Sequence, residues 1–314
     1  MNENIFYLIL KSARPRQWMK NFALYAALIF SGFFFYQSNH ELPYFVIVTY
    51  AFFIFCMLTS AIYIINDIID APADRLHPFK KRRPIASGKL PIPIALYAVC
   101  ILLAATLLTS LMLSPFFQLT LFAYFALQIV YATKTKNIAI LDVLSIAGGF
   151  LLRIYAGAVV VNLHTSVWFL LTVLSASLFL AVGKRQSERT LLIGKDIGET
   201  KTLKRYSERL LDQYTGMFAN ATWLTYALFA FQTQNSAPEG DYLRLFTILP
   251  KTLQSQKLLM LTVPFVIFGV MRYLQLVYED NEGESPEKVI LRDRPLLIDT
   301  FLLGIVTMGV LYIF

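Results

Sequence analysis

The chain has 314 residues, of which 57% are hydrophobic and only 15% are charged. Soluble proteins carry about 25% charged residues and about 45–50% apolar residues, so an ordinary soluble domain is excluded, as is a disordered chain. The two cysteines, Cys56 and Cys100, lie inside apolar runs, which excludes a disulfide framework and a cysteine metal site. The composition predicts an all-α polytopic membrane protein, which we treat as one domain over residues 1–314.

Apolar runs long enough to cross a membrane recur along the chain. A transmembrane helix needs about 20 mostly apolar residues to cross about 30 Å of hydrocarbon. The candidate runs, of which the first is short, are 22–37, 44–66, 92–112, 115–133, 138–160, 165–183, 214–232, 258–278 and 296–314. The sequence therefore predicts about nine transmembrane helices, with eight or ten as the alternatives.

The basic residues predict the orientation of these helices. Of the 28 Lys and Arg residues, 23 fall in the N-terminal segment and in every second connection, whereas the other connections hold 3, all within 233–257. By the positive-inside rule the N-terminus and the basic segments are cytoplasmic, in an inner or plasma membrane. The excess of 28 basic over 20 acidic residues then reflects topology, and we expect no nucleic-acid partner.

Two weaker signals complete the topology. The apolar run Ile5–Leu10 is too short for the core of a cleavable signal peptide, and no small-residue cleavage site follows it. The second signal lies in the external connection 233–257. There the pattern of Tyr242–Leu253 predicts an amphipathic helix lying at the membrane interface.

Four polar residues follow the second apolar run: Asn66, Asp67, Asp70 and Asp74. On a helix, positions 66, 70 and 74 share one face, and Asp67 lies about 100° from it. Oxygen ligands of this kind suit Mg²⁺. Pro72 predicts a break or kink near Asp70, with Asp74 reaching the site from a loop. The alternative interpretation is a charged helix end that pairs with the basic loop after it.

That basic loop contains Lys80, Arg82 and Arg83. A basic run beside a membrane helix is by itself typical of a topology signal or an anionic-lipid contact. Next to the acidic residues, it favours a diphosphate that is bound through Mg²⁺ and clamped by cations. Candidate phosphate ligands in the other cytoplasmic segments are Arg14, Lys20, Tyr131, Lys134, Lys136, Lys184, Arg185 and Glu188.

Simpler interpretations compete at several of these positions. Trp18 with its flanking cations is typical of an anchor at the membrane interface. Lys184 and Glu188 are four residues apart and could pair with each other. Asp142 and Arg153, eleven residues apart inside the fifth apolar run, share a helix face and are expected to line an interior polar cavity. A structural network with neighbouring side chains is the alternative for that pair.

The pattern Asn66-Asp67-x-x-Asp70-x-x-x-Asp74 resembles the NDxxDxxxD motif of the UbiA superfamily of intramembrane prenyltransferases. The resemblance implies a nine-helix, all-α enzyme whose cytoplasm-facing cavity binds a diphosphate substrate through Mg²⁺. Four further segments resemble one branch of that superfamily: Arg14-Pro-x-Gln17-Trp18-x-Lys20-Asn21, Arg83-Pro84-x-Ala86-Ser87-Gly88, Gly183-Lys184-Arg185 with Glu188, and Asp293-Arg294-Pro295-Leu296.

That branch transfers 5-phosphoribose from phosphoribosyl diphosphate to a polyprenyl phosphate of the decaprenyl type, giving a lipid-linked precursor of cell-envelope polysaccharide such as arabinan. The chain departs from most of the superfamily because the loop after its sixth apolar run has no second Asp-rich motif. Lys184 and Arg185 stand there instead, and Asp196 and Glu199 are too scattered to match. Cations in that loop suit an acceptor that is itself an anionic phosphate.

The resemblance also implies roles for single residues. Asn66 and Asp70, with Asp74 or Asp67, are expected to hold Mg²⁺, and Asp70, Asp67 and Lys20 are the candidate catalytic residues. The cations of the loop after the second apolar run are expected to neutralise the departing diphosphate. The remaining basic residues are expected to bind the acceptor phosphate or the ribose 5-phosphate, and they are Arg14, Lys20, Lys184 and Arg185. An oligomer is compatible with the sequence. The alternatives are an aromatic prenyltransferase of the UbiA type and an organic-anion transporter, although transporters gather their polar residues near mid-membrane.

Overall fold

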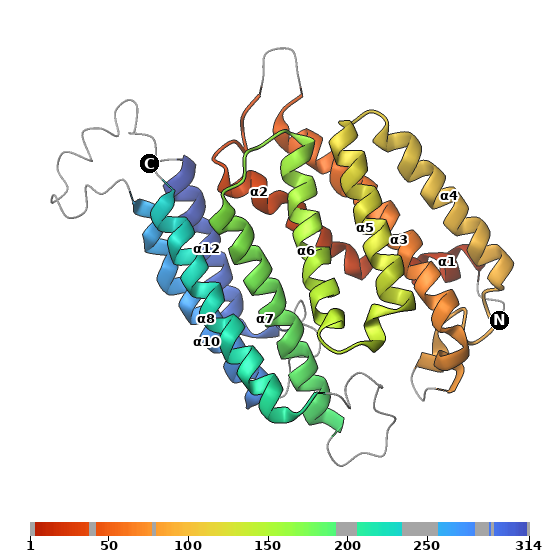
Figure 1. Ribbon diagram of the computed structural model, residues 1–314. Helices are drawn as coiled ribbons and strands as arrows, with labels where there is room; N and C mark the ends of the chain where they lie inside the picture. Colours follow the sequence, from red (N-terminus) through yellow and green to blue (C-terminus); the bar gives the residue numbers. More distant parts are fainter. Residues whose placement is uncertain are drawn as a thin grey trace. The chain divides into compact units, whose positions relative to one another are not determined.

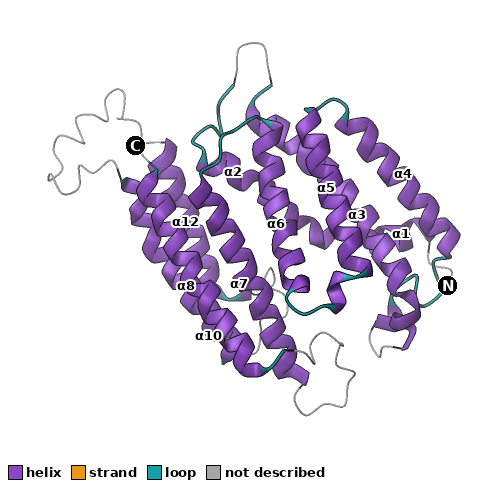
Figure 2. Ribbon diagram, in the orientation of Figure 1, coloured by secondary structure: helices purple, strands orange, loops and turns teal. Residues whose placement is uncertain are grey.

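The computed structural model describes residues 4–37, 42–76, 80–192, 206–233, 257–279, 289 and 292–312, without the side chains of residues 190–192. Every regular element in these ranges is a helix (Figures 1 and 2). The all-α prediction is thereby confirmed. The interfacial helix expected at Tyr242–Leu253, and the residues Asp196 and Glu199, lie outside the described part of the chain.

Contacts divide the chain into two compact units. The first comprises residues 1–28 and 33–163, and the second comprises residues 29–32 and 164–314. The first unit holds α1 (Ile5–Ala13), the 3₁₀ helix η1 (Pro15–Ala23), most of α2 (Leu24–Phe30), α3 (Tyr44–Leu76), η2 (Lys80–Arg82), α4 (Ile92–Ser110), α5 (Pro115–Thr133), η3 (Thr135–Asn137) and α6 (Leu141–Val160). The second unit holds α7 (Val167–Leu192), α8 (Glu208–Gln232), η5 (Leu258–Thr262), α10 (Val263–Tyr278) and α12 (Arg294–Tyr312).

In the described part of the chain, seven helical segments are long and apolar enough to cross a membrane. Each of the nine predicted runs overlaps a helix, but two of these helices fail that test, so the count of nine is not confirmed. The first run yields only the seven residues of α2, because Gly32 turns the chain with a φ of +77°. The second helix that fails the test is α8, in which polar residues such as Asn220 interrupt the apolar sequence.

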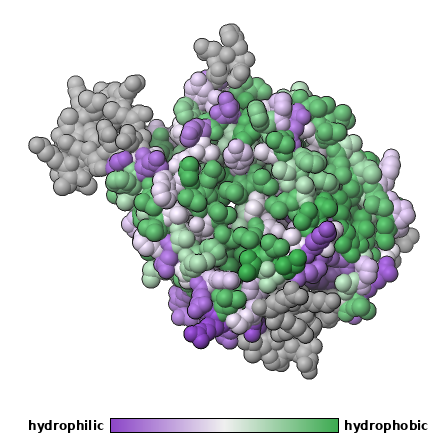
Figure 3. Space-filling view, in the orientation of Figure 1, coloured by the Kyte–Doolittle hydropathy of each residue, from purple (hydrophilic) through white to green (hydrophobic). Residues whose placement is uncertain are grey.

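Each unit has its own apolar core. In the first unit, Phe55 and Leu58 of α3 pack with Phe117 and Tyr124 of α5. In the second unit, Phe179, Tyr273, Leu276 and Leu296 join α7, α10 and α12. Large apolar side chains also cover much of the visible surface (Figure 3). Such a surface is expected where helices face lipid instead of water.

The break expected near Asp70 does not occur. Helix α3 continues through Pro72 to Leu76, so Asp74 stands on the helix and not on a loop. A proline in a helix removes a single backbone hydrogen bond, here the one that would reach the carbonyl of Ile68. Packing of Ala71 and the ion pairs of the neighbouring aspartates hold the last turns in place of that bond.

Candidate active site

Two buried carboxylates meet two guanidinium groups at the end of α3. Asp67 and Asp74 lie about two turns apart and are 2% and 4% exposed. Nη1 of Arg83 lies 3.3 Å from Oδ1 of Asp67 and 2.6 Å from Oδ2 of Asp74. Arg14, at the start of η1, pairs with the same oxygen of Asp67. Buried carboxylates need such partners because an unpaired buried charge is costly.

The third carboxylate of the motif has a cation of its own. Lys136, in the short helix η3 between α5 and α6, places Nζ 2.5 Å from Oδ1 of Asp70. Three carboxylates on α3 are therefore matched by three cations that come from η1, from the loop after α3 and from η3. The alternative interpretation, in which the acidic helix end pairs with the basic loop, describes Arg83 correctly.

Asn66 differs from the three aspartates. Its Oδ1 is buried and has no hydrogen-bond partner among the residues that the structure describes, which is unusual because most buried side-chain oxygens are satisfied. In the described ranges no three His, Cys, Asp or Glu side chains are grouped as a metal cage. Mg²⁺ needs no such cage, because it is usually held by one or two carboxylates together with water and substrate phosphates. The orphaned oxygen of Asn66, one turn from Asp70, fits that kind of site.

The charged residues of α6 are both buried. Asp142 is 0% exposed and Arg153 is 5% exposed. Nε of Arg153 donates to Oδ1 of Asn21 over 3.1 Å, and its other nitrogens donate to the carbonyl of Gly149 and the hydroxyl of Tyr124. Arg153 thus belongs to a structural network, as the alternative interpretation held. Sequence reasoning missed Tyr124, an uncharged residue in an apolar run.

The remaining predicted phosphate ligands of the first unit are half-buried or exposed. Lys20 is half-buried on η1, and Tyr131 is half-buried near the end of α5. The more exposed cations belong to the two connecting segments and are Lys80, Arg82 and Lys134.

In the second unit, Glu188 holds both predicted cations of α7. Its Oε1 lies 3.7 Å from Nζ of Lys184, and its Oε2 lies 2.5 Å from Nη1 of Arg185. The simpler alternative, in which Lys184 and Glu188 pair with each other, is confirmed. Asp293 has a structural role: its Oδ1 accepts the N–H of Leu296 over 2.9 Å and caps α12, and its Oδ2 pairs with Arg272 over 2.7 Å.

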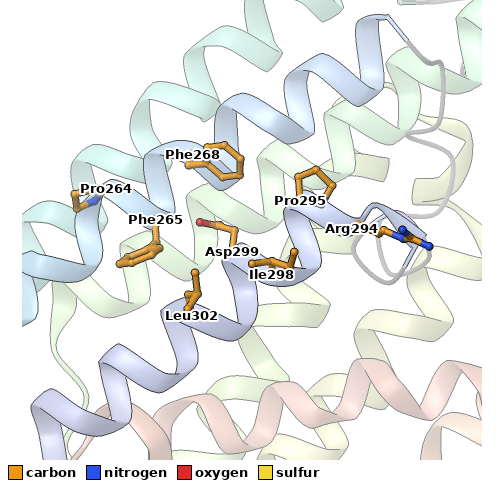
Figure 4. Close-up of a pocket in the computed structure, with 8 residues that line it drawn as sticks. All are labelled: Pro264, Phe265, Phe268, Arg294, Pro295, Ile298, Asp299 and Leu302. Carbon is orange, nitrogen blue, oxygen red and sulfur yellow. The ribbon is translucent and has the colours of Figure 1, made fainter.

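A pocket of about 610 Å³ lies between α10 and α12 (Figure 4). Its lining is mostly apolar, with Arg294 at one end and the carboxyl group of Asp299 near the middle. None of the α3 carboxylates lines it. The residues that do are Pro264, Phe265, Phe268, Arg294, Pro295, Ile298, Asp299 and Leu302. The pocket is therefore distinct from the acidic cluster on α3.

Known proteins share both the sequence and the fold. Decaprenyl-phosphate phosphoribosyltransferase of Mycolicibacterium smegmatis is 34% identical over 310 residues, covering 98% of this chain and 93% of that protein. The enzyme of the same name from Corynebacterium glutamicum is 32% identical over 293 residues, covering 92% and 82%. A UbiA homolog from Archaeoglobus fulgidus, solved with GPP and Mg²⁺, shares the fold with a TM-score of 0.65 at 18% identity, covering 97% of this chain and 99% of that one. Residues 23–289 match the UbiA prenyltransferase family. The chain therefore belongs to the UbiA prenyltransferase family and is an integral membrane transferase.

Proposed function

We propose that the protein transfers 5-phosphoribose from phosphoribosyl diphosphate to a polyprenyl phosphate. The two bacterial relatives that match over most of this chain are named for a phosphoribosyl transfer to decaprenyl phosphate. The observation that carries the proposal is the cluster on α3, in which three cations pair with three carboxylates beside the orphaned oxygen of Asn66. Such a cluster suits a substrate that brings phosphate groups and a metal ion together.

Asn66 and Asp70 are the residues that would hold Mg²⁺, with Asp74 joining them when Arg83 turns to a phosphate. Bound Mg²⁺ would neutralise charge on the leaving diphosphate. Asp67, which is buried against Arg14 and Arg83, would keep these two guanidinium groups beside the substrate. This assignment favours Asp74 over Asp67 as the third ligand, because Asp67 is paired with two cations and Asp74 with one.

The cations would bind the donor by exchanging partners. Arg14, Arg83 and Lys136 each pair with a carboxylate of α3. A diphosphate offers them stronger, multidentate acceptors, and the carboxylates they release become available to the metal. The supporting phosphate ligands would be Lys20, Lys80, Arg82, Tyr131 and Lys134.

The transfer itself needs no strong general base. The bond between C1 of the ribose and the diphosphate oxygen breaks, and the diphosphate leaves with the electron pair. A lipid phosphate oxygen, already ionised near pH 7, forms the new bond to C1. Lys184 and Arg185 would hold the acceptor phosphate or the ribose 5-phosphate, and substrate would compete with Glu188 for them.

We place these steps on the cytoplasmic side of the plasma membrane, because the basic segments concentrate there by the positive-inside rule. The product would be a lipid-linked phosphoribose for cell-envelope polysaccharide. Residues 1–314 would act as a single domain in this scheme.

A paired turnover assay tests the proposal. Purified protein in lipid receives phosphoribosyl diphosphate and polyprenyl phosphate in one arm, and polyprenyl diphosphate and hydroxybenzoate in the other, each with Mg²⁺ or with chelator. Mass spectrometry should find a phosphoribosylated lipid in the first arm with Mg²⁺ only. Asp70→Asn and Asn66→Leu should abolish it. A prenylated ring in the second arm would favour an aromatic prenyltransferase instead.

A further inference from the structure

Arg153 is a buried cation with no acidic partner among the described residues. It lies in α6, is 5% exposed, and forms no ion pair with any carboxylate of the described residues. Its guanidinium group lies over the rings of Tyr124 and Phe150, at 4.8 Å and 5.3 Å from their centroids. Its hydrogen bonds all go to neutral acceptors, one of which is the side-chain oxygen of Asn21. A buried cation of this kind depends on each of its acceptors.

Asn21 connects Arg153 to α3. It is 0% exposed, and its amide uses both ends: Oδ1 accepts from Arg153, and Nδ2 donates to Oγ1 of Thr59 over 3.2 Å and to Sγ of Cys56 over 3.4 Å. Asn21 stands near the end of η1. Through this one amide, α6 holds η1 against α3.

The contacts of η1 continue along the same face of α3 toward the acidic cluster. Trp18 donates Nε1 to Oγ of Ser60 over 3.0 Å. Arg14 then lies over the ring of Tyr63, 5.2 Å from its centroid, and pairs with Asp67. These contacts fix η1 to one face of α3 at three successive turns, because residues three or four apart share a helix face. The residues of α3 are Thr59 and Ser60 in the first turn, Tyr63 in the next and Asp67 in the third.

The backbone of η1 indicates that this placement is imposed by side chains. A 3₁₀ helix of more than three or four residues is uncommon, yet η1 extends over nine residues. Arg14 before it has a φ of +53°, in the left-handed region that residues other than glycine rarely adopt. Unfavourable backbone of this kind persists where the surrounding contacts determine it.

We infer that Arg153 is a positioning residue: through Asn21 it holds η1 on α3 and so keeps Arg14 at Asp67, where Arg14 can bind the donor diphosphate. The binding of the diphosphate by Arg14 rests on the proposed function of the acidic cluster on α3. Arg153 itself acts at a distance, since Asn21 binds α3 at Thr59, eight residues before Asp67, which is about 12 Å along the helix.

The first test measures the placement of η1 without any ligand. Hydrogen–deuterium exchange is followed in the peptide that covers residues 14–23 of the protein in lipid nanodiscs. Arg153→Met should raise exchange there, and Arg153→Lys, which keeps a donor for Asn21, should restore part of the protection. Trp18→Phe, which removes only the bond to Ser60, should also raise exchange and serves if Arg153→Met does not fold. Tyr25→Phe is the matched control, because it removes the bond from Tyr25 to Thr49 away from Arg14.

The second test asks whether Arg153 acts through Arg14. Binding of inorganic diphosphate in the presence of Mg²⁺ is measured for Arg14→Met, Arg153→Met and the double variant. Each single variant should weaken binding by about tenfold, and the double variant should be little weaker than either, because contacts in one network are not additive. The combination of Arg14→Met with Tyr25→Phe should bind as Arg14→Met does.

Unchanged exchange in residues 14–23 for both Arg153→Met and Trp18→Phe would overturn the inference, whatever the protein's reaction. Fully additive losses in the double variant would also overturn it, because Arg153 would then act independently of Arg14. Raised exchange together with unimpaired diphosphate binding by Arg14→Met would support the hold on η1 and overturn the role of Arg14 in the proposed function.

Discussion

Lys136 and Asp70 are 66 positions apart in the sequence, yet Nζ of the lysine lies 2.5 Å from Oδ1 of the aspartate. Both side chains are partly exposed, at 27% and 36%. An ion pair that water reaches contributes only about 0–1 kcal/mol to stability. The pair therefore contributes little to folding, and under the proposed function it occupies an oxygen that Mg²⁺ would use.

Lys136→Met should have opposite effects on the two ligands. Loss of the ammonium leaves Asp70 open to Mg²⁺, so affinity for Mg²⁺ alone should rise about threefold to tenfold, while affinity for diphosphate in the presence of Mg²⁺ falls by a similar factor. Isothermal titration of each ligand measures both changes. Lys81→Met removes the same charge from the exposed helix η2 and should change neither value by as much. A parallel loss of both affinities in Lys136→Met would contradict the exchange of partners.

Arg83 should matter for stability as well as for binding. Arg83→Met leaves Asp74 without its cation and Asp67 with only Arg14. Removing one partner of a buried pair is costly, and because Arg83 is 29% exposed we expect a loss of about 1–3 kcal/mol. The unfolding midpoint in detergent measures it.

Two further variants test this cause. Asp74→Asn in the Arg83→Met background should recover part of the lost stability, because it removes the charge left unpaired. Arg82→Met changes an exposed neighbour and should leave the midpoint close to that of the native chain. An equal loss from Arg82→Met would mean that the net charge of the loop, and not pairing with α3, sets the stability.

The sequence predicts the fold well because the membrane imposes a simple rule. A run of about 20 apolar residues must be a helix, and α4 and α5 lie almost where their runs do. The rule fails at α2, because the first two residues of the run, Phe22 and Ala23, belong to η1 and Gly32 ends the helix early.

The residues of the candidate site could be predicted from the sequence, but the ion pairs between them could not. Asn66, Asp70 and the cations stand out because charged residues are rare in this chain. Which cation meets which carboxylate depends on tertiary contacts over many residues, as between Arg14 and Asp67. The partners of Arg153 are harder still to foresee, because Asn21 and Tyr124 are neutral residues on other helices and far from it in the sequence.

Gly157 of α6 permits a close approach that no other residue would allow. A Cβ atom there would lie 1.9 Å from the carbonyl oxygen of Leu24, at the start of α2. Gly157→Ala should therefore push α2 and α6 apart and lower stability by about 1–3 kcal/mol or more, as overpacking does. Thermal unfolding in detergent measures the loss. Gly216→Ala is the matched control, because a Cβ atom at Gly216 meets nothing within 4 Å, and alanine there should be neutral or slightly stabilising.

Asp293 gives the second unit a dependence on acid. The hydrogen bonds from Arg272 lower the pKa of Asp293 below its ordinary value, and the N–H of Leu296 acts in the same direction. A carboxyl group with a lowered pKa in the folded state stabilises the protein fully above its ordinary pKa of about 3.9 and loses that contribution as the pH falls through the lowered value. The cap and the ion pair at the start of α12 should therefore weaken only below about pH 4.

Unfolding midpoints between pH 3 and pH 7 test the origin of this dependence. Asp293→Asn keeps an acceptor for Leu296 but loses the ion pair, so it should be less stable than the native chain at pH 7, and the difference should shrink as the pH falls below about 4. Arg272→Gln removes the main cause of the lowered pKa. In this variant the carboxyl group of Asp293 should therefore protonate at a higher pH, and the acid-induced loss of stability should begin at a higher pH. A difference between Asp293→Asn and the native chain that stays constant from pH 7 to pH 3 would mean that the charge of Asp293 does not carry its contribution to stability.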